Sequence, residues 1–449
     1  MFDLHVGLLQ GESLSPILYS LFVNDIESEL INSNCQSYQL QLLHLFILMY
    51  ADDTVLFTED ATDLQNMLDC LQNYANKWSL SVNIDKTKIV VFRKSKRLQA
   101  NEYWTFQGRA IDIVDNFCYL GLVFNYNGRF TLALNTLASQ GRKSYYLLNS
   151  RMKKYMLNVE TKLSLFDTYV SCVLNYCCEV WGSHPAPKIE SVHLLFLKSL
   201  LNVKKTVNSS MVYFETGRFT LHIQRKIMVM KYWLKLLRTD NCILKSCYNA
   251  LFELIIKKPN YKLNWLYDVK NDLGRCGFNN IWIAQNVDNE KHFLELYSQR
   301  LHDIFIQELR CAFDVSPKCE IYKHLVDNFE IQFYLKKPLN SKTKQILSKY
   351  RMQAHSLQIE AGRYNAVPRG DRLCTVCDKN DVEDEMHFVL LCPAYSELRK
   401  KFIKTYYHKH PSVYKLIMLF SSKNVKSLNL LGKYLIQATE KRKIIINQQ

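Results

Sequence analysis

The sequence predicts an α+β fold with a mixed N-terminal part, a long helical region and a small metal-binding module. Strand-like alternation of apolar and polar residues is confined to about the first 130 residues. Apolar residues then recur at helical spacing over most of the remaining chain, and cysteines with a histidine gather near its end. The expected domains are residues 1–130, 131–240, 241–345, 346–410 and 411–449, the last being a basic helical tail.

The composition is that of a basic globular protein. The chain has 449 residues, 48% of them hydrophobic and 22% charged. This composition excludes an intrinsically disordered chain, and the length excludes a fold built on a single hydrophobic core. Its formal charge of +16 favours a polyanionic partner, with nucleic acid ahead of a membrane surface. No signal peptide or membrane-spanning apolar run is recognisable. We therefore expect an intracellular protein, cytoplasmic or nuclear and not secreted, whose 14 cysteines are mostly small buried hydrophobes.

In the first 130 residues, helical periods alternate with short strand patterns. Helices are expected over residues 14–31 and from a cap signal at Asp60 through Trp78. Strands are expected at 45–50, 54–58 and 86–94, and a further strand pair within 116–130 is expected to turn at Asn127-Gly128. Beyond this part the predicted helices are 131–155, 159–182, 188–202, 221–238, 241–256 and 290–313.

Two adjacent carboxylates, Asp52 and Asp53, lie between apolar runs in "HLFILMYADDTVLFTED". Such neighbours repel each other, and apolar surroundings raise the free-energy cost of their charges. A tight strand reversal lets both reach one rim, where converging anions need a cation, and hard oxygen ligands suit Mg²⁺. Two such ions about 3.5–4 Å apart are the arrangement of two-metal phosphoryl transfer. The alternative is a polar β-turn, in which aspartate is common.

Four segments, in this order and spacing, resemble the later palm motifs of reverse transcriptases, above all those of non-LTR (LINE-type) retrotransposons. They are "GLLQGESLSPILYSLFVND" (7–25), "MYADDTVLF" (49–57), "LSVNIDKTKIVVF" (80–92) and "YLGLVFNYNG" (119–128). The resemblance implies an incomplete right-hand polymerase palm over residues 1–130. It also implies a helical thumb and post-thumb region to residue 240, followed by a helical extension.

By this resemblance, Asp52 is a direct metal ligand and Asp53 its supporting partner, with Mg²⁺ as the cofactor of an active enzyme. The implied reaction is attack of a primer 3′-hydroxyl on an incoming deoxynucleotide, templated by RNA, with pyrophosphate leaving. The implied partners are an RNA template, a DNA primer and deoxynucleotides, and no membrane.

The resemblance also assigns residues that hold the substrates. The alternatives are an ordinary helix-capping loop for the glycine-rich turn and a solvated surface lysine for Lys86. By the resemblance, the template base and the incoming nucleotide contact Gly7, Gln10 and Gly11. The triphosphate lies near Asn83 and Lys86, and the primer end is held by Tyr119, Leu120 and Gly121.

One metal-binding carboxylate of the family has no counterpart here. In the family it lies on a palm strand upstream of the Gln-Gly turn, whereas Met1 comes only six residues before Gly7. Asp3 and Glu12 lie nearby but outside the matching motif. We therefore expect a truncated RNA-directed DNA polymerase with impaired two-metal catalysis. The alternatives are a non-catalytic RNA- or DNA-binding protein that uses the thumb and metal module, and a product without a role.

A second metal site is predicted at Cys374, Cys377, His387 and Cys392, which form a C-x2-C-x9-H-x4-C pattern. Thiolate and imidazole ligands in a closed tetrahedron favour structural Zn²⁺. The alternative is three unrelated cysteines and a surface histidine. The flanking sequence also resembles the zinc-knuckle-like tail that follows the polymerase in many of these elements.

The expected duty of this module is to grip nucleic acid. Basic residues in the module and in the preceding thumb segment support this expectation, because phosphates supply sequence-independent affinity. The acidic run from Asp381 to Glu385 counts against a uniformly basic surface. The supporting residues are Arg363, Arg369, Arg372, Lys198, Lys204 and Lys205.

Overall fold

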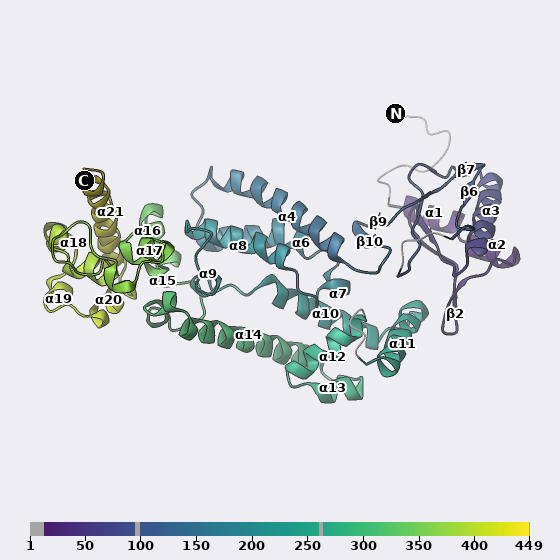
Figure 1. The fold of residues 1–449 in the computed structure, drawn as a ribbon. Coiled ribbons are helices and arrows are strands. Elements are labelled where there is room, and N and C mark those ends of the chain that lie inside the picture. The colour runs from purple at the N-terminus through teal and green to yellow at the C-terminus, as the bar shows by residue number, and fades with distance from the viewer. Residues whose placement is uncertain (1–12, 95–98, 260–263, 449) are drawn as a thin grey trace. The chain divides into compact units, whose positions relative to one another are not determined.

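The computed structural model describes residues 13–94, 99–259 and 264–448 (Figure 1). The predicted site residues Gly7, Gln10 and Gly11 lie outside the described residues. The chain divides into two compact units. Unit 1 comprises Met1–Ala133 and Met230–Asp288, and unit 2 comprises Leu134–Val229 and Asn289–Gln449.

Unit 1 begins with two short helices where the sequence pattern predicts one. They are α1 (Ser15–Phe22) and α2 (Ile26–Asn32). The break falls at Asn24 and Asp25, whose short polar side chains favour turns and caps over helix interiors. The Tyr74 hydroxyl donates to Asp25 Oδ1 at 2.5 Å, which holds this turn against the next helix. The prediction of one uninterrupted helix over 14–31 is therefore wrong, although both halves of this segment are helical.

The acidic hairpin and the helix after it are confirmed. The strands are β3 (Ile47–Tyr50) and β4 (Asp53–Leu56), preceded by the hairpin of β1 (Tyr38–Leu40) and β2 (Leu43–Leu45). Helix α3 (Ala61–Lys77) follows, and its N-cap Asp60 accepts a hydrogen bond from Thr62 N at 2.7 Å.

In the described stretches of unit 1, six further short strands follow α3. They are β5 (Lys88–Ile89), β6 (Thr105–Phe106), β7 (Arg109–Ala110), β8 (Asp112–Ile113), β9 (Asn116–Tyr119) and β10 (Leu122–Asn125). In the part of the chain that the structure describes, each strand pairs with one other, and β5 with β8 is the parallel pair. The strand expected over 86–94 is therefore mostly irregular.

The last hairpin turns earlier than the sequence predicts. Tyr119 pairs with Leu122, so Leu120 and Gly121 form the two-residue loop. Both have positive φ, 46° and 79°, as a type I′ turn requires. Asn127-Gly128 instead forms a separate turn before α4 (Thr131–Met152). The prediction of a hairpin turn at Asn127-Gly128 is wrong, because the pairing of Asn116–Tyr119 with Leu122–Asn125 ends before these residues.

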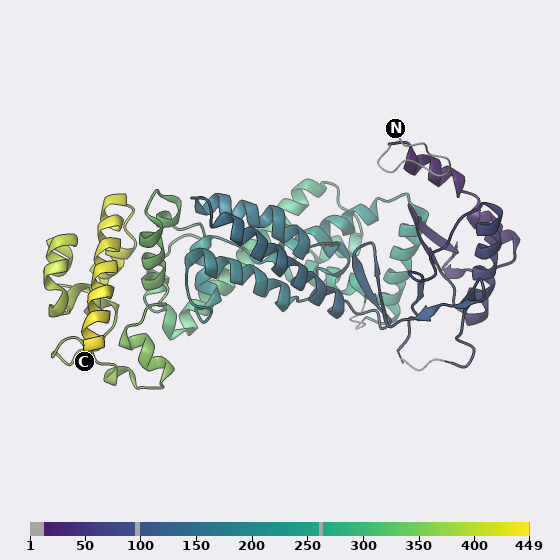
Figure 2. The same cartoon turned by 90° about the horizontal axis from the view of Figure 1, so that it is seen from above.

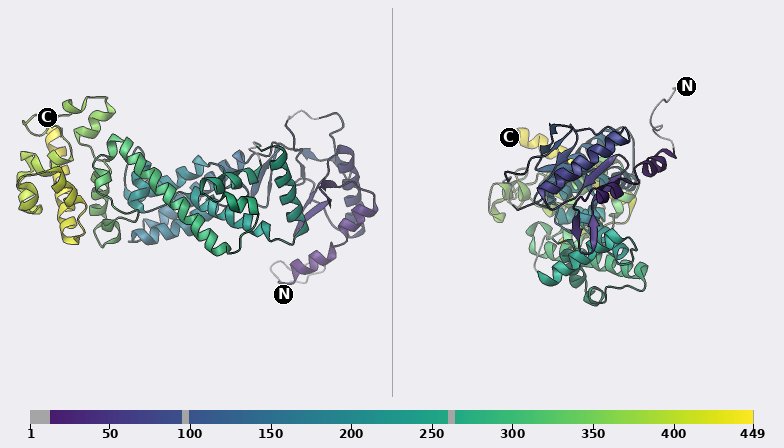
Figure 3. Two further views of the ribbon diagram at one scale, coloured as in Figure 1. Left: turned by 90° about the horizontal axis from the view of Figure 1, so that it is seen from below. Right: turned by 90° about the vertical axis from the view of Figure 1, so that its right-hand side faces the viewer.

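Helix α3 packs against the short strands and holds together the two apolar clusters of this part (Figures 2 and 3). Its Met67 and Tyr74 face α2 and the acidic hairpin. The next residue after Met67, Leu68, points about 100° around the helix and packs with Trp104 and Phe106. Unit 1 also contains α11 (Cys242–Lys257), α12 (Trp265–Arg275), α13 (Asn279–Ala284) and the end of α10 (Leu221–Leu237).

Unit 2 is helical. It begins with most of α4 and includes the first part of α10. Between these two helices lie α5 (Val159–Phe166), a π-helix (Asp167–Ser171), α6 (Cys172–Leu174), α7 (Cys178–Trp181), α8 (Pro187–Leu201) and α9 (Ser209–Thr216). Its later helices are α14 (Glu290–Val315), α15 (Phe333–Lys336), α16 (Ser341–Arg351), α17 (Gln358–Tyr364), α18 (Ser396–Phe402), α19 (Thr405–His408), α20 (Val413–Phe420) and α21 (Val425–Gln448). The helix expected over 159–182 is divided by the π-helix and by Cys177, whose φ is 52°.

A buried ion pair lies at the centre of unit 2. Arg351 Nε donates to Glu215 Oε1 at 2.7 Å, and both side chains are at most 3% exposed. The Tyr322 hydroxyl donates to the other carboxylate oxygen at 2.8 Å. Arg351 also donates to Phe420 O at 2.8 Å and to Gln332 Oε1 at 3.1 Å. Since a buried charge is tolerated only when paired and hydrogen-bonded, these contacts fix α9, α16 and α20 together.

A buried histidine lies nearby on α8. His193 is fully buried, its ring stacks on Phe166 with centroids 5.4 Å apart, and neither ring nitrogen has a hydrogen-bond partner within the described residues. Burial, and then the charges of Arg218 and Arg225, lower its pKa to about 3. The imidazole is therefore neutral in the folded protein at ordinary pH.

Replacing Arg351 by Met is expected to destabilise unit 2 by about 3–5 kcal/mol, because Glu215 is left as an uncompensated buried charge. Urea unfolding followed by circular dichroism measures this change. The control is Lys336→Met, whose exposed pair with Glu330 is worth at most about 1 kcal/mol. Adding Glu215→Met to Arg351→Met is expected to recover stability; a double variant no more stable than Arg351→Met would contradict the pairing argument.

His193→Leu is expected to alter how stability depends on pH. Because the folded pKa lies below the unfolded value of 6.5, the unfolded state binds the proton first, and wild-type stability falls as pH drops from about 6.5 toward 3. Relative to the leucine variant, the wild type should lose about 1 kcal/mol between pH 7 and pH 5.5. Parallel urea titrations measure the difference, and a constant difference across this window would rule out the neutral buried histidine.

Candidate catalytic hairpin and metal centre

The acidic hairpin has a two-residue loop made of Ala51 and Asp52. Tyr50 pairs with Asp53, so Asp53 is the first residue of β4 rather than part of the loop. Ala51 has φ 53°, a left-handed conformation that residues with a Cβ adopt at a cost. Both carboxylates are exposed at the tip, where solvent ions can reach them.

The two carboxylates have different tyrosine neighbours. Burial and then the negative charge of Asp52 raise the pKa of Tyr19 on α1. Burial and then the charge of Asp53 raise the pKa of Tyr119 at the end of β9. The fold therefore brings two of the predicted site segments together, since the tip of the acidic hairpin lies near the Tyr119 hairpin although 66 residues separate Asp53 from Tyr119 in the sequence.

The predicted triphosphate-binding residues form a turn before β5. Asn83 Oδ1 accepts a hydrogen bond from Lys86 N at 3.1 Å, and Asn83 O accepts from Thr87 N at 3.0 Å. The amide of Asn83 is thus used to shape the turn. Lys86 is exposed and has no ion-pair partner in the described part of the chain, so its ammonium group is available to an anion.

The predicted primer-grip residues occupy the turn between β9 and β10. Leu120 has φ 46°, which is unusual for a bulky residue, and its side chain is 38% exposed. Gly121 meets the same left-handed requirement without a steric cost. A strained, exposed leucine at a hairpin tip is the kind of feature that clusters at functional sites.

The cysteines and histidine of the second predicted site do converge. The ligand atoms of Cys374, Cys377, His387 and Cys392 all lie within 4.8 Å of one another. Three of the four residues are buried, and hydrogen bonding with the Cys392 thiol lowers the pKa of Cys374 to about 3. Three sulfurs and one imidazole nitrogen fit a closed zinc site by number, ligand type and spacing. The reading of unrelated cysteines is therefore not supported.

Two backbone devices position these ligands. Cys374 N donates to Asp381 O at 2.9 Å, which closes the turn that carries the two nearer cysteines. Residues His387–Leu391 form a π-helix in which Cys392 N donates to His387 O at 2.7 Å. The wider turn brings His387 and Cys392 to the same centre, and such single π turns are frequent at functional sites.

The acidic run beside the site serves the site itself. Asp381 Oδ2 lies 3.6 Å from His387 Nδ1, the ring nitrogen that faces away from Cys377 Sγ, which is 3.4 Å from Nε2. At this separation the Asp381 carboxylate adds negative charge beside the imidazole but makes no hydrogen bond to it. Asp384 Oδ1 accepts from His387 N at 2.8 Å. Sequence reasoning missed the role of Asp384, although an acidic residue three positions before the histidine was the available signal.

The two glutamates of the run are buried ion-pair partners. Glu383 accepts two hydrogen bonds from Arg442 on α21, at 2.6 and 2.5 Å. Glu385 Oε1 lies 2.9 Å from His355 Nε2; burial alone would raise the pKa of Glu385, but this contact lowers it. These carboxylates therefore face the interior and do not make the surface acidic.

The three arginines expected to grip nucleic acid are mostly engaged within the protein. Arg372 donates to Val367 O at 2.9 Å and Ile359 O at 3.0 Å, and Arg363 pairs with Glu360 at 2.6 Å. Only Arg369 is well exposed, with a pair to Glu320 at 3.2 Å. Arg372 and Arg363 thus hold the module together, and their contact with nucleic acid stays a prediction.

The match to a known family lies in the N-terminal part of the chain. Residues 3–124 match the family described as reverse transcriptase (RNA-dependent DNA polymerase). The matched stretch makes up 122 of the 449 residues. It includes the acidic hairpin, the Asn83–Lys86 turn and the Tyr119 hairpin, so the resemblance inferred from the motifs is confirmed.

Two curated relatives carry the same name, "RNA-directed DNA polymerase from mobile element jockey". The protein of Drosophila funebris is 28% identical over 210 residues, and that of Drosophila melanogaster is 24% identical over 207 residues. Each alignment covers 44% of this chain and 22% of the relative. The chain thus matches about a fifth of the length of these proteins, which belong to a non-LTR, LINE-type element.

Among the described residues, each helix is too short or too polar to cross a bilayer.

The metal centre predicts a measurable zinc content. The purified chain should contain about one zinc per molecule, and Cys374→Ser should lower this content at least fivefold, since a structural site needs all of its ligands. Elemental analysis by mass spectrometry measures the ratio. Cys311→Ser, which changes an exposed cysteine outside the cluster, is the matched control. Equal zinc content in the two variants would be incompatible with this site.

Proposed function

We propose that this chain acts in RNA-templated DNA synthesis as part of the reverse transcriptase of a non-LTR retrotransposon. The observation that carries the proposal is the exposed Asp52–Asp53 tip, in a domain of the matching family, close to the Tyr119 hairpin. On this proposal, residues up to about 130 are the palm and the following helices the thumb. The relatives support RNA-directed DNA polymerase as the reaction class.

In this proposal Asp52 and Asp53 hold divalent cations, with Mg²⁺ favoured by their hard oxygen ligands. When bound, the cations would supply charge stabilisation to the attacking and leaving oxygens of the transferred phosphoryl group. Two exposed carboxylates at one hairpin tip fit this role, because neither has a competing ion pair in the described part of the chain. Lys86 then places its free ammonium group toward the triphosphate, and the Leu120-Gly121 turn positions the primer end.

Primer extension on a poly(rA)–oligo(dT) substrate with Mg²⁺ tests the catalytic role. Asp52→Asn is expected to reduce incorporation by at least about 100-fold, because it removes a direct metal ligand. Glu59→Gln, which removes an exposed carboxylate beside the hairpin, is expected to stay within about twofold of wild type and serves as the control. Wild-type incorporation that persists in Asp52→Asn would contradict the assignment of Asp52.

A second candidate is a non-catalytic RNA- or DNA-binding protein that uses the thumb and metal module. The complete Cys₃His cluster and the formal charge of +16 favour it. Nucleic-acid binding by wild type with a steep salt dependence, but without any incorporation, would select this candidate over the polymerase. For both candidates we propose structural Zn²⁺ at the cluster, supported by its ligand set.

A further inference from the structure

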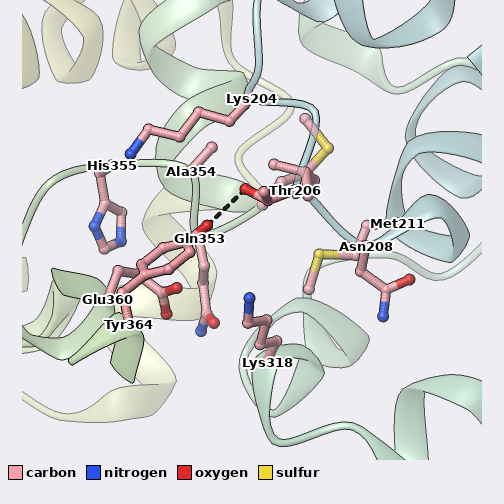
Figure 4. A pocket seen from close by; sticks show the side chains of 12 residues that line it. Lys204, Thr206, Asn208, Met211, Lys318, Gln353, Ala354, His355, Glu360 and Tyr364 are labelled. Atoms are coloured by element: carbon pink, nitrogen blue, oxygen red, sulfur yellow. Dashed lines mark hydrogen bonds between the residues drawn. The ribbon is translucent and has the colours of Figure 1, made fainter. Parts of the chain in front are cut away.

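A pocket in unit 2 brings together side chains from three segments that are distant in sequence (Figure 4). Lys204 and Thr206 come from the loop between α8 and α9, Lys318 from the 3₁₀ turn Pro317–Cys319, and Tyr364 from the end of α17. The open space within the pocket is about 330 Å³. That volume includes open solvent, so the site is an open surface depression rather than an enclosed cavity.

The two lysines supply the pocket with positive charge. In the described part of the chain, neither Lys204 nor Lys318 has an ion-pair partner. The Lys318 ammonium group lies 5.8 Å from the centre of the Tyr364 ring, and Figure 4 shows both lysine side chains extending toward the pocket around this tyrosine. Two unpaired ammonium groups at one concave site are suited to an anion such as a phosphate.

The acidic groups around the pocket are already matched by cations or donors. Glu360 lines it, but its carboxylate pairs with Arg363 at 2.6 Å. With its amide oriented to suit its neighbours, Gln353 also donates to Glu360 Oε1 at 3.3 Å. His355, which lines the pocket too, is held by Glu385 at 2.9 Å. The charges of the lysines are therefore what an incoming ligand would meet.

The aromatic wall adds a second element of recognition. Tyr364 is 59% exposed, although its hydroxyl is fixed by donation to Thr206 Oγ1 at 2.6 Å. An exposed ring whose position is set by a hydrogen bond offers a face for stacking. Aromatic side chains beside a positively charged groove are how proteins hold unpaired bases, each stack being worth roughly 1–3 kcal/mol.

We propose that this pocket binds one nucleotide of a single-stranded nucleic acid, with a backbone phosphate between Lys204 and Lys318 and a base on Tyr364. The inference rests on the proposed function in either of its forms, because both require contact with nucleic acid. It names a definite contact point at which the α8–α9 loop and the segment before the metal module act together. Duplex bases are stacked on each other and cannot reach the ring, so the site prefers single strands.

The test is fluorescence anisotropy of a 5′-fluorescein-labelled 20-mer of uridine between 50 and 300 mM KCl. The double variant Lys204→Gln/Lys318→Gln is expected to bind about 5- to 30-fold more weakly at 100 mM KCl. Its slope of log affinity against log salt should be shallower by about 1.4, since two phosphate contacts to a single strand contribute about 0.7 each. The matched control Lys426→Gln/Lys433→Gln removes the same charge from exposed positions on α21 and should retain the wild-type slope.

Two tyrosine variants separate stacking from charge. Tyr364→Phe keeps the ring and is expected to bind within about twofold of wild type, whereas Tyr364→Ala should lose about 5-fold or more for the 20-mer. For a 20-base-pair RNA duplex, Tyr364→Ala should have no effect. An equal loss for duplex and single strand would overturn the stacking contact. Zinc content and thermal unfolding of each variant show that it is folded.

The outcomes distinguish this inference from the function on which it rests. Wild type that fails to bind the 20-mer would overturn both the proposed function and the pocket. Wild type that binds with a steep salt slope, while the pocket variants match the α21 control, would overturn the pocket alone.

Discussion

The requirement that a buried charge be fully paired organises unit 2. Glu215 and Arg351 come from positions 136 residues apart, and each would be costly alone in the interior. Their pairing is acceptable only if Tyr322 and the carbonyl of Phe420 complete the hydrogen bonds. Four segments must therefore reach their places together. A well-packed apolar cluster would tolerate small shifts of these segments, but a buried guanidinium with directed donors does not.

The same principle links the metal centre to its surroundings. Within the module, the ligands are positioned by a closed turn and a π-helix, and the backbone N–H of His387 donates to Asp384 Oδ1. Outside it, Glu383 connects the strand-like segment of the module to Arg442 on α21. Figure 1 shows α21 beside α16 and α18, so the C-terminal helix covers both the module and the neighbouring helix. The module is thus an integrated part of unit 2.

Local sequence signals predicted local structure well. The alternation around Asp52 and Asp53 predicted the hairpin, the cap at Asp60 predicted α3, and the C-x2-C-x9-H-x4-C spacing predicted the cluster, because each depends on neighbours in sequence. The misplaced turn at Asn127-Gly128 shows the limit of such signals: Asn-Gly is the stronger type I′ sequence, yet strand pairing imposed the turn on Leu120-Gly121.

What the sequence could not supply were contacts between distant segments. The acidic run was expected to weaken a basic surface, but Glu383 and Glu385 are satisfied by Arg442 and His355, whose positions no local pattern reveals. Likewise, Lys204 was recognised as basic, whereas its neighbour Lys318 lies 114 residues away and is isolated in the sequence.

If the Cys₃His cluster holds an ion, the pairing of Glu383 with Arg442 couples binding of that ion to docking of the last helix. Glu383 follows the CxxC turn and precedes His387 by only four residues. Displacement of α21 would therefore leave an unpaired carboxylate within the segment that carries the ligands. Displacement of α21 would then lower the affinity for the ion by the same factor by which the bound ion strengthens the docking of α21. A change in the docking of the C-terminal helix would consequently change ion binding at the cluster, and the reverse.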